Sequence, residues 1–154
     1  MSSKTLNKSE IKQLNQTLND LYGKEFFNKK DLIQITQNPI KHIKLNKEPV
    51  FFFEKEKPIP LLKLLLKEQF LKTITVDMGA IKFICNGADV MKPGITDLDE
   101  NIRKGEIIVI VDEKNKKPLV VGETLYSGEE IKQKTDGKVI KNLHFITDNK
   151  WDLN

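Results

Sequence analysis

The chain has 154 residues, of which 38% are hydrophobic and 31% charged, a composition that suits one core or two small ones. It is too short for an eight-stranded α/β barrel, and no stretch reaches the roughly 20 apolar residues of a membrane span. The first residues lack the apolar segment of a secretory signal, and a single cysteine, Cys85, excludes a disulfide framework or a multi-cysteine zinc site. We therefore expect a soluble cytoplasmic protein without a membrane partner.

The net charge of +4 is unevenly distributed along the chain. Residues 1–72 carry 14 lysines and 8 acidic residues, a net charge of +6, whereas residues 73–154 have a net charge of −2. Of 26 basic residues only Arg103 is an arginine, so bidentate contacts to guanine or phosphate are nearly excluded. The lysine excess would favour contact with nucleic-acid phosphates. A lysine-rich genomic composition explains the same excess equally well.

Residues 1–72 have the pattern of a compact α+β module. Apolar residues recur at helical spacing after Ser9, which has an N-cap side chain, and Gly23 suits the position that ends a helix. Alternating runs then predict about three antiparallel strands, followed by a leucine-rich helix with prolines in its first turn. We place these strands and this helix at Asp31–Gln37, Ile40–Leu45, Glu48–Glu54 and Leu61–Leu66, with Pro58 and Pro60 opening the helix.

The aromatic run Phe51–Phe53 within this module is predicted to be core. Three consecutive residues of one strand must face both sides, so at least some of these rings are buried and do not form a surface for stacking bases. We expect the module to supply docking charge instead, chiefly from Lys41, Lys44 and Lys47 beside the strands.

Residues 73–154 have many short strands, few helices and frequent glycine turns, a pattern typical of a small β-barrel. The organisation is therefore two modules, 1–72 and 73–154. In chain order we expect a strand at Thr73–Asp77, a helix at Met78–Cys85, a brief strand or bend at Asp89–Lys92, a hairpin of Glu106–Val111 with Pro118–Thr124, a short helix from Ser127 ended by Gly137, and a last strand at Val139–Ile146, with Trp151 holding the C-terminal residues against the core.

Catalytic and metal-binding patterns are scarce in this sequence. His42 and His144 are the only histidines, and lone histidines are more often packed or exposed than bound to a metal. Cys85 lies in an apolar helical stretch, where a buried, inert thiol is expected. No phosphate-binding loop, dinucleotide fingerprint or nucleophile elbow occurs. The sequence thus predicts no catalytic residue, no metal site and no cofactor.

The most informative stretch is Val76–Ile95, V-D-M-G-A-I-K-F-I-C-N-G-A-D-V-M-K-P-G-I. Gly87 and Ala88 leave the turn after its helix without side-chain bulk, so a backbone or ribose could approach closely, and Lys82 and Lys92 flank this gap. Gly87 serves equally well as a plain helix C-cap, and the residues by themselves leave both interpretations open.

The segment N-G-A-D-V-M-K-P-G-I resembles the signature of the PUA domain, the RNA-binding module named after pseudouridine synthases and archaeosine transglycosylases. The later blocks V-V-G-E-T, Y-S-G-E-E-I and G-K-V-I-K-N-L-H-F-I-T-D-N-K-W-D follow in the same order. With E-F-F-N-K-K-D and P-V-F-F-F-E upstream, the whole chain is similar to archaeal proteins related to the malignant T-cell amplified sequence family. The predicted fold is therefore α+β, an N-terminal α+β module followed by a PUA-type β pseudo-barrel of five or six strands.

The resemblance implies that the first helix, the adjoining loop and the second strand of the barrel form an RNA-facing groove. In it the small residues would admit the backbone, the lysines would pair with phosphates, Met91 would touch ribose, and Asp89 would form the turn. Carried over by position, the RNA-binding residues are Lys82, Gly87, Ala88, Asp89, Val90, Met91, Lys92, Pro93 and Gly94, with Lys141 at the border of the groove.

The resemblance also predicts a non-catalytic role in translation, through binding to the small ribosomal subunit or to tRNA during initiation, reinitiation or recycling. The alternative is an accessory subunit that presents tRNA or rRNA to a separate modification enzyme. The sequence predicts neither the RNA species, nor the bases contacted, nor a protein partner, nor the oligomeric state.

Overall fold

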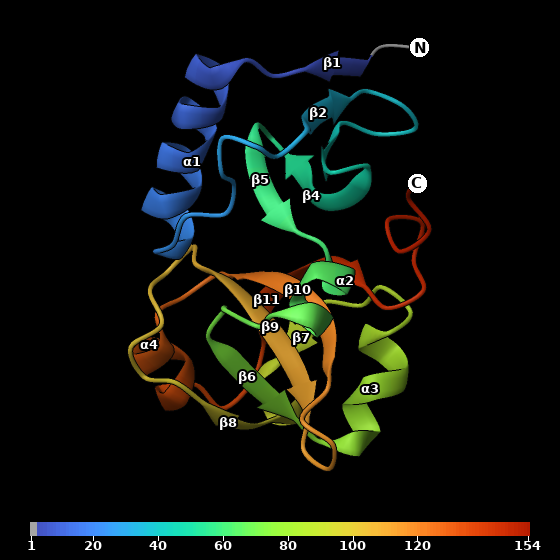
Figure 1. Cartoon of the computed structure of the whole chain (residues 1–154). Coiled ribbons are helices and arrows are strands. Elements are labelled where there is room, and N and C mark those ends of the chain that lie inside the picture. Colours follow the sequence, from blue (N-terminus) through green and yellow to red (C-terminus); the bar gives the residue numbers. More distant parts are fainter. Residues whose placement is uncertain (1–2) are drawn as a thin grey trace.

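The computed structural model describes residues 3–154, which form two sheets stacked end to end with helices at their sides (Figure 1). A five-stranded N-terminal sheet has the order β1-β2-β3-β4-β5, and a six-stranded C-terminal sheet has the order β7-β11-β10-β9-β6-β8. The α+β class predicted from the sequence is confirmed. None of the helices in this part of the chain is long and apolar enough to cross a membrane.

The N-terminal sheet is antiparallel throughout, and α1 covers one of its faces. The helix α1 begins after Asn7, whose side chain accepts from the Glu10 N–H while the Glu10 carboxylate accepts from the Asn7 N–H. The N-cap prediction at Ser9 was therefore wrong, and Gly23 ends the helix in the left-handed conformation as expected. The elements are β1 (Ser3–Thr5), α1 (Lys8–Tyr22), β2 (Ile33–Thr36), β3 (His42–Leu45), β4 (Glu48–Glu54), β5 (Lys57–Pro60) and α2 (Leu62–Lys67).

The prolines before α2 belong to a strand and not to the helix. Pro58 and Pro60 lie in β5, at the edge of the sheet, where the missing N–H groups of proline are tolerated. The turn into β5 consists of Lys55 and Glu56, both at positive φ, which matches the right-handed twist of a hairpin without an Asn-Gly signal. The sequence prediction missed β5 because it assigned these prolines to the first turn of the helix, and it also missed β1.

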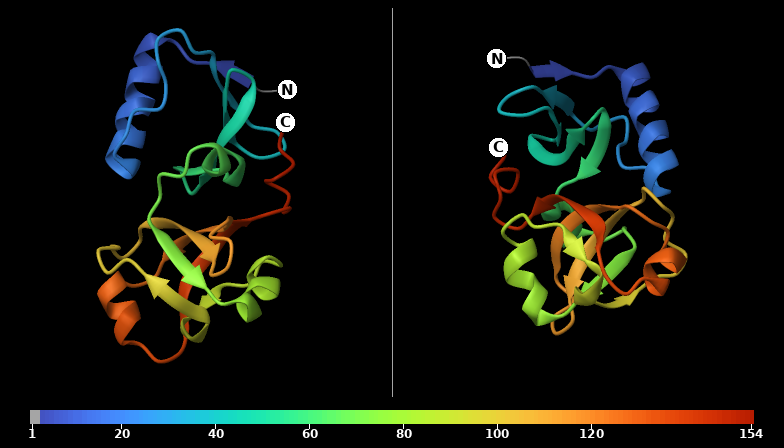
Figure 2. Two further views of the ribbon diagram at one scale, coloured as in Figure 1. Left: turned by 60° about the horizontal axis from the view of Figure 1, so that its bottom comes forward. Right: turned by 180° about the vertical axis from the view of Figure 1, so that it is seen from behind.

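The C-terminal sheet wraps around its own core, with α3 and α4 at opposite sides (Figure 2). Its pairings are antiparallel except for β6 with β9, which run parallel. The last short helix ends at Gln133, with Lys134 as its C-cap, earlier than the predicted Gly137. The elements are β6 (Thr73–Val76), α3 (Met78–Ile84), β7 (Val90–Met91), the 3-10 turn η1 (Lys92–Gly94), β8 (Ile95–Leu98), β9 (Ile107–Asp112), β10 (Pro118–Thr124), α4 (Gly128–Gln133) and β11 (Lys138–Phe145).

The two sheets share a hydrophobic core. In β4, Phe51 packs with α1 in the N-terminal core, whereas the next residue, Phe52, packs toward the C-terminal sheet. In β9, Ile108 and Ile110 face the C-terminal core, and alternate residues of the strand face the shared core. Both phenylalanines are fully buried, as predicted for the aromatic run. The buried residues of the shared core are Phe52, Ile59, Leu61, Leu62, Leu65, Leu71, Ile107, Val109, Val111, Val121, Leu143 and Leu153.

Candidate nucleic-acid interface

The predicted RNA-facing residues form one continuous part of the C-terminal unit, made of α3, the loop after it, β7 and η1. We call residues 78–94 the α3–β7 surface. It lies on the side of the C-terminal sheet opposite α4 (Figures 1 and 2). Two contacts hold its ends together: the Asp77 side chain caps α3 by accepting from the Ala80 N–H at 2.9 Å, and the Asp77 N–H donates to the Gly94 carbonyl at 2.9 Å. A Cβ at Gly94 would lie only 3.1 Å from that of Ala80, so η1 packs directly on the helix.

Asn142 of β11 holds the loop of this surface in place. Its side-chain Nδ2 donates to the carbonyls of Ile84 and Ala88, each at 2.9 Å. Its backbone N–H donates to Asp89 Oδ1 at 2.8 Å, and the same carboxylate pairs with Lys138 at 3.3 Å. Asp89 therefore fixes the turn, as the resemblance implied.

Gly87 adopts a backbone conformation that favours glycine. Its φ is +99°, and its N–H donates to the Ile84 carbonyl at 3.1 Å, which closes the turn after α3. The residue is exposed, and a Cβ built on it would meet only the Phe145 ring, at 3.4 Å. Gly87 thus ends the helix and at the same time leaves the surface beside it open.

The lysines of the surface have different environments. Lys82 is exposed, with Nζ 5.1 Å from the centroid of the Phe83 ring. Lys92 is half-buried, and its ammonium donates to the Lys134 carbonyl at 2.8 Å, which ties η1 to the end of α4. Lys134 Nζ in turn lies 4.1 Å from the centroid of the Tyr126 ring. The sequence analysis assigned no site role to Tyr126, Lys134 or Lys138, although Tyr126 and Lys138 lie in the blocks that carry the resemblance.

Two of the predicted site residues do not present their side chains at the loop: one side chain is buried, and the other lies on a different face of its strand. Val90 is buried in the C-terminal core, so its side chain supports the surface from below. Lys141 pairs in register with Glu123 of β10, and by the alternation of β11 its side chain lies on the other face of the strand from Asn142. The structure therefore does not bring Lys141 to the loop. Met91, by contrast, is 51% exposed.

The histidines and the cysteine have structural environments. His42 and His144 are both fully buried. Cys85 is half-buried rather than buried, and burial raises the pKa of its thiol, which keeps it in the unreactive protonated form. Within residues 3–154, no three histidine, cysteine or acidic side chains are grouped so as to hold a metal ion.

Comparisons with known proteins agree with this architecture. The PUA domain family matches residues 72–146. The chain is 43% identical to an uncharacterized protein of Methanocaldococcus jannaschii, over 96% of this chain and 94% of that protein. It is 33% identical to translation machinery-associated protein 20 of Saccharomyces cerevisiae (84% and 76% covered) and 35% identical to malignant T-cell-amplified sequence 1 of Rattus norvegicus (81% and 72% covered).

The likeness extends to solved structures. The crystal structure of a hypothetical protein from Pyrococcus horikoshii superposes with a TM-score of 0.83 at 33% identity and covers 98% of both chains, so the whole two-sheet arrangement is shared and not only the PUA domain. By sequence and by fold, this chain belongs to the PUA-domain family of malignant T-cell-amplified sequence 1 and translation machinery-associated protein 20.

Proposed function

We propose that this protein is a non-catalytic RNA-binding protein of translation, which binds the small ribosomal subunit or tRNA during initiation, reinitiation or recycling. The PUA domain and relatives named for the translation machinery support this role. The observation that carries the proposal is the α3–β7 surface, where a bulk-free turn at Gly87 and Ala88 is exposed and Lys82 of the preceding helix is exposed as well. Such a surface allows an RNA backbone to approach closely and meets it with positive charge.

The buried acid–imidazole pair of the chain supports a non-catalytic role. His144 Nδ1 and Asp148 Oδ1 lie 2.9 Å apart, the arrangement that orients a catalytic histidine in many hydrolases. Here His144 Nε2 accepts from the Leu62 N–H at 3.0 Å, and Asp148 accepts from the N–H groups of Phe145, Lys150 and Trp151. These backbone N–H groups occupy Nε2 and the carboxylate, so we infer that the pair stabilises the fold.

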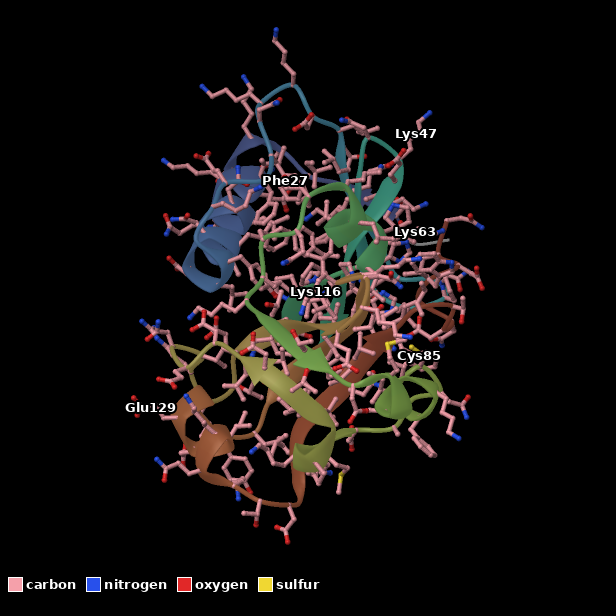
Figure 3. All side chains as sticks on the ribbon, turned by 90° about the horizontal axis from the view of Figure 1, so that it is seen from below. Phe27, Lys47, Lys63, Cys85, Lys116 and Glu129 are labelled. Atoms are coloured by element: carbon pink, nitrogen blue, oxygen red, sulfur yellow. The ribbon has the colours of Figure 1, made fainter. Side chains whose placement is uncertain are left out.

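The N-terminal sheet offers a second positively charged surface, at the β3–β4 hairpin. Lys47 is exposed and points outward from the hairpin (Figure 3). Lys44 precedes it on β3, whereas the Lys41 ammonium lies 3.7 Å from Glu56 and 4.4 Å from the centroid of Phe53. We propose that Lys44 and Lys47 dock this module on a large negatively charged partner, the small ribosomal subunit, while the α3–β7 surface makes the closer RNA contacts.

The test is sedimentation of the full chain with purified small subunits at low salt. We expect wild-type protein to co-sediment and the Lys44→Glu/Lys47→Glu variant to co-sediment less. The matched control is Lys8→Glu/Lys12→Glu, which makes the same change of charge on the exposed face of α1 and should bind like wild type. Equal losses in both variants would show that only net charge matters, which would overturn the docking role of the hairpin.

A second measurement separates the two roles in RNA metabolism. Tagged protein from cells should bring down small ribosomal subunits. Recovery of an RNA-modification enzyme in place of ribosomal subunits would overturn the translation role and support the accessory role.

A further inference from the structure

A groove of about 520 Å³ lies between α2 and the face of the C-terminal sheet that borders the shared core. Leu66 of α2 forms part of one wall and is 43% exposed, whereas the adjacent Leu65 is buried. The groove shares no residue with the α3–β7 surface, and its strand β8 is at the opposite edge of the sheet from β7. An exposed leucine beside a hollow marks a place where another molecule can bury apolar area.

The floor of this groove is a single row of residues that crosses four strands. Thr75 of β6 pairs in register with Asp97 of β8 on one side and with Val111 of β9 on the other. Val111 in turn pairs with Pro118 of β10. Cross-strand partners share one face of a sheet and neighbouring strands are about 4.8 Å apart, so the row is about 14 Å long.

Opposite charges lie at the two ends of the row. Asp97 is on the edge strand β8, and Lys116 is in the turn between β9 and β10 at the other end; both side chains line the groove and are exposed. Within residues 3–154 neither takes part in an ion pair, and Lys132, which lies near Asp97, pairs with Glu100. The groove therefore has a negative end, an apolar and hydroxyl-bearing middle and a positive end.

An extended polypeptide matches both the charges and the length of the groove. Alternate side chains of an extended chain point to the same side, and the rise is about 3.4 Å per residue, so residues four positions apart share a side at a separation of about 13 Å. A basic and an acidic residue with this spacing reach Asp97 and Lys116 at the same time. Both ends of the groove are open to solvent, so a longer chain can enter and leave. A nucleic acid fits less well, because its phosphates would meet Asp97.

We propose that this groove is the docking site for an extended segment of a partner protein, which carries a basic and an acidic residue four positions apart and an apolar residue midway between them. The basic side chain pairs with Asp97, the acidic side chain pairs with Lys116, and the apolar side chain packs on Val111 and Leu66. The side chain of Thr75 contributes a hydroxyl for the peptide groups of the segment. This inference adds a protein partner to the proposed function and does not depend on RNA binding.

The test is fluorescence anisotropy of the full chain with the labelled peptide Gly-Lys-Ser-Val-Ser-Glu-Gly, for which we expect saturable binding. Asp97→Asn and Lys116→Gln should each weaken binding about 2- to 5-fold, the effect of losing one exposed ion pair. Lys114→Gln removes a charge from the same turn but outside the groove, so it is the matched control and should bind like wild type. Absence of binding by wild type at peptide concentrations up to about 1 mM would overturn the proposal.

An exchange of charges tests how the segment is oriented. Asp97→Lys should bind the peptide more weakly than Asp97→Asn, and it should regain affinity when the lysine of the peptide is replaced by glutamate, because the pair is then restored with its signs reversed. Replacement of the peptide glutamate by lysine should not restore affinity to Asp97→Lys. A peptide with the glutamate one position closer to the lysine should bind wild type more weakly, since the two charges then point to opposite sides of the chain.

Two outcomes would show that the groove does not hold such a segment. The first is that the charge-exchanged peptide fails to regain affinity for Asp97→Lys. The second is that Lys116→Gln binds the peptide like wild type but binds labelled tRNA more weakly, which would assign the groove to RNA. Neither outcome changes the residues of the α3–β7 surface, so the proposed RNA-binding function is judged separately by its own experiments.

Discussion

His144 Nε2 accepts a hydrogen bond from the backbone N–H of Leu62, 82 residues earlier in the chain, at 3.0 Å. Leu62 is the first residue of α2, and the N-cap residue Leu61 has no side chain able to satisfy the free N–H groups of that helix end. A histidine of the C-terminal sheet therefore caps a helix that follows the N-terminal sheet. The acceptor role of Nε2 places the proton on Nδ1, which donates to Asp148. The two sheets are joined by this buried polar contact as well as by the shared core.

Asp148→Ala should lower the free energy of unfolding by about 2–4 kcal/mol, because the imidazole and three backbone N–H groups lose a buried charged acceptor. Urea denaturation followed by circular dichroism measures the change. Asp152→Ala, at an exposed position four residues later, is the control and should change stability by no more than about 0.5 kcal/mol. Equal midpoints for the two variants would show that the network contributes little.

The stability of the protein should depend on Asp148 at acid pH. Burial by itself would raise the pKa of this carboxyl group, but hydrogen bonds from His144 and from the backbone of Phe145 and Trp151 outweigh burial and hold the pKa below its usual value. A lowered folded-state pKa stabilises the protein at pH values above the unfolded pKa of about 3.9, and this stabilisation disappears as the pH falls through the folded pKa. Wild type should therefore lose more stability than Asp148→Asn between about pH 5 and pH 2, measured by thermal unfolding across that range. If the stability of wild type and of Asp148→Asn fell in parallel as the pH decreased, the lowered pKa of Asp148 would be contradicted.

The fragment 73–154 should be less stable than the full chain and should bind the dye ANS. The division at residue 72 is a prediction about sequence organisation, and removing residues 1–72 would expose the shared-core residues Val109, Val121 and Leu143 to water. Loss of these contacts should lower the thermal midpoint and broaden the transition. A fragment as stable as the whole protein, without ANS binding, would show that the shared core is dispensable.

Gly87→Glu should abolish RNA binding while the protein remains folded. At φ +99° any side chain costs about 1 kcal/mol of strain, so Gly87→Ala should lose a similar amount of stability without adding charge. The glutamate adds bulk and a negative charge at the predicted phosphate contact. Anisotropy with fluorescently labelled tRNA and thermal melts of both variants separate the two effects. Should both variants keep wild-type RNA affinity, Gly87 acts only as a helix cap.

RNA affinity should fall steeply with salt, because the surface offers lysines and almost no arginine. Each phosphate contact contributes a slope of roughly 0.7–0.9 in log K against log salt, so three to five lysines predict a slope of about −2 to −4. Titrations from low to moderate salt with wild-type protein give the slope, and Lys82→Gln should reduce its magnitude by about 1. An affinity independent of salt would contradict lysine–phosphate contacts and leave stacking or recognition of RNA shape as the main source of binding.

Several elements could be predicted from local sequence alone. The apolar periodicity after Asn7 determines α1, although Ser9 and Asn7 are both good capping residues and only the backbone shows which one caps. The apolar run Glu106–Val111 predicted one strand of a hairpin with Pro118–Thr124, and β9 does pair antiparallel with β10. β5 was missed because Pro58 and Pro60 suit the first turn of a helix as well as they suit an edge strand, and the sheet order decides between the two.

By itself, the sequence determined the fold class, the family and the position of the Gly87 turn, because periodicity, glycine placement and motif order are local properties of the chain. The tertiary structure decided which side chains of the predicted site are free. Lys82 is exposed, whereas Lys92 is engaged by the Lys134 carbonyl, and Asn142 fixes a loop 53 or more residues earlier in the chain. Such contacts join residues far apart in sequence whose spacing follows no helix or strand period, so only the packed chain brings them together.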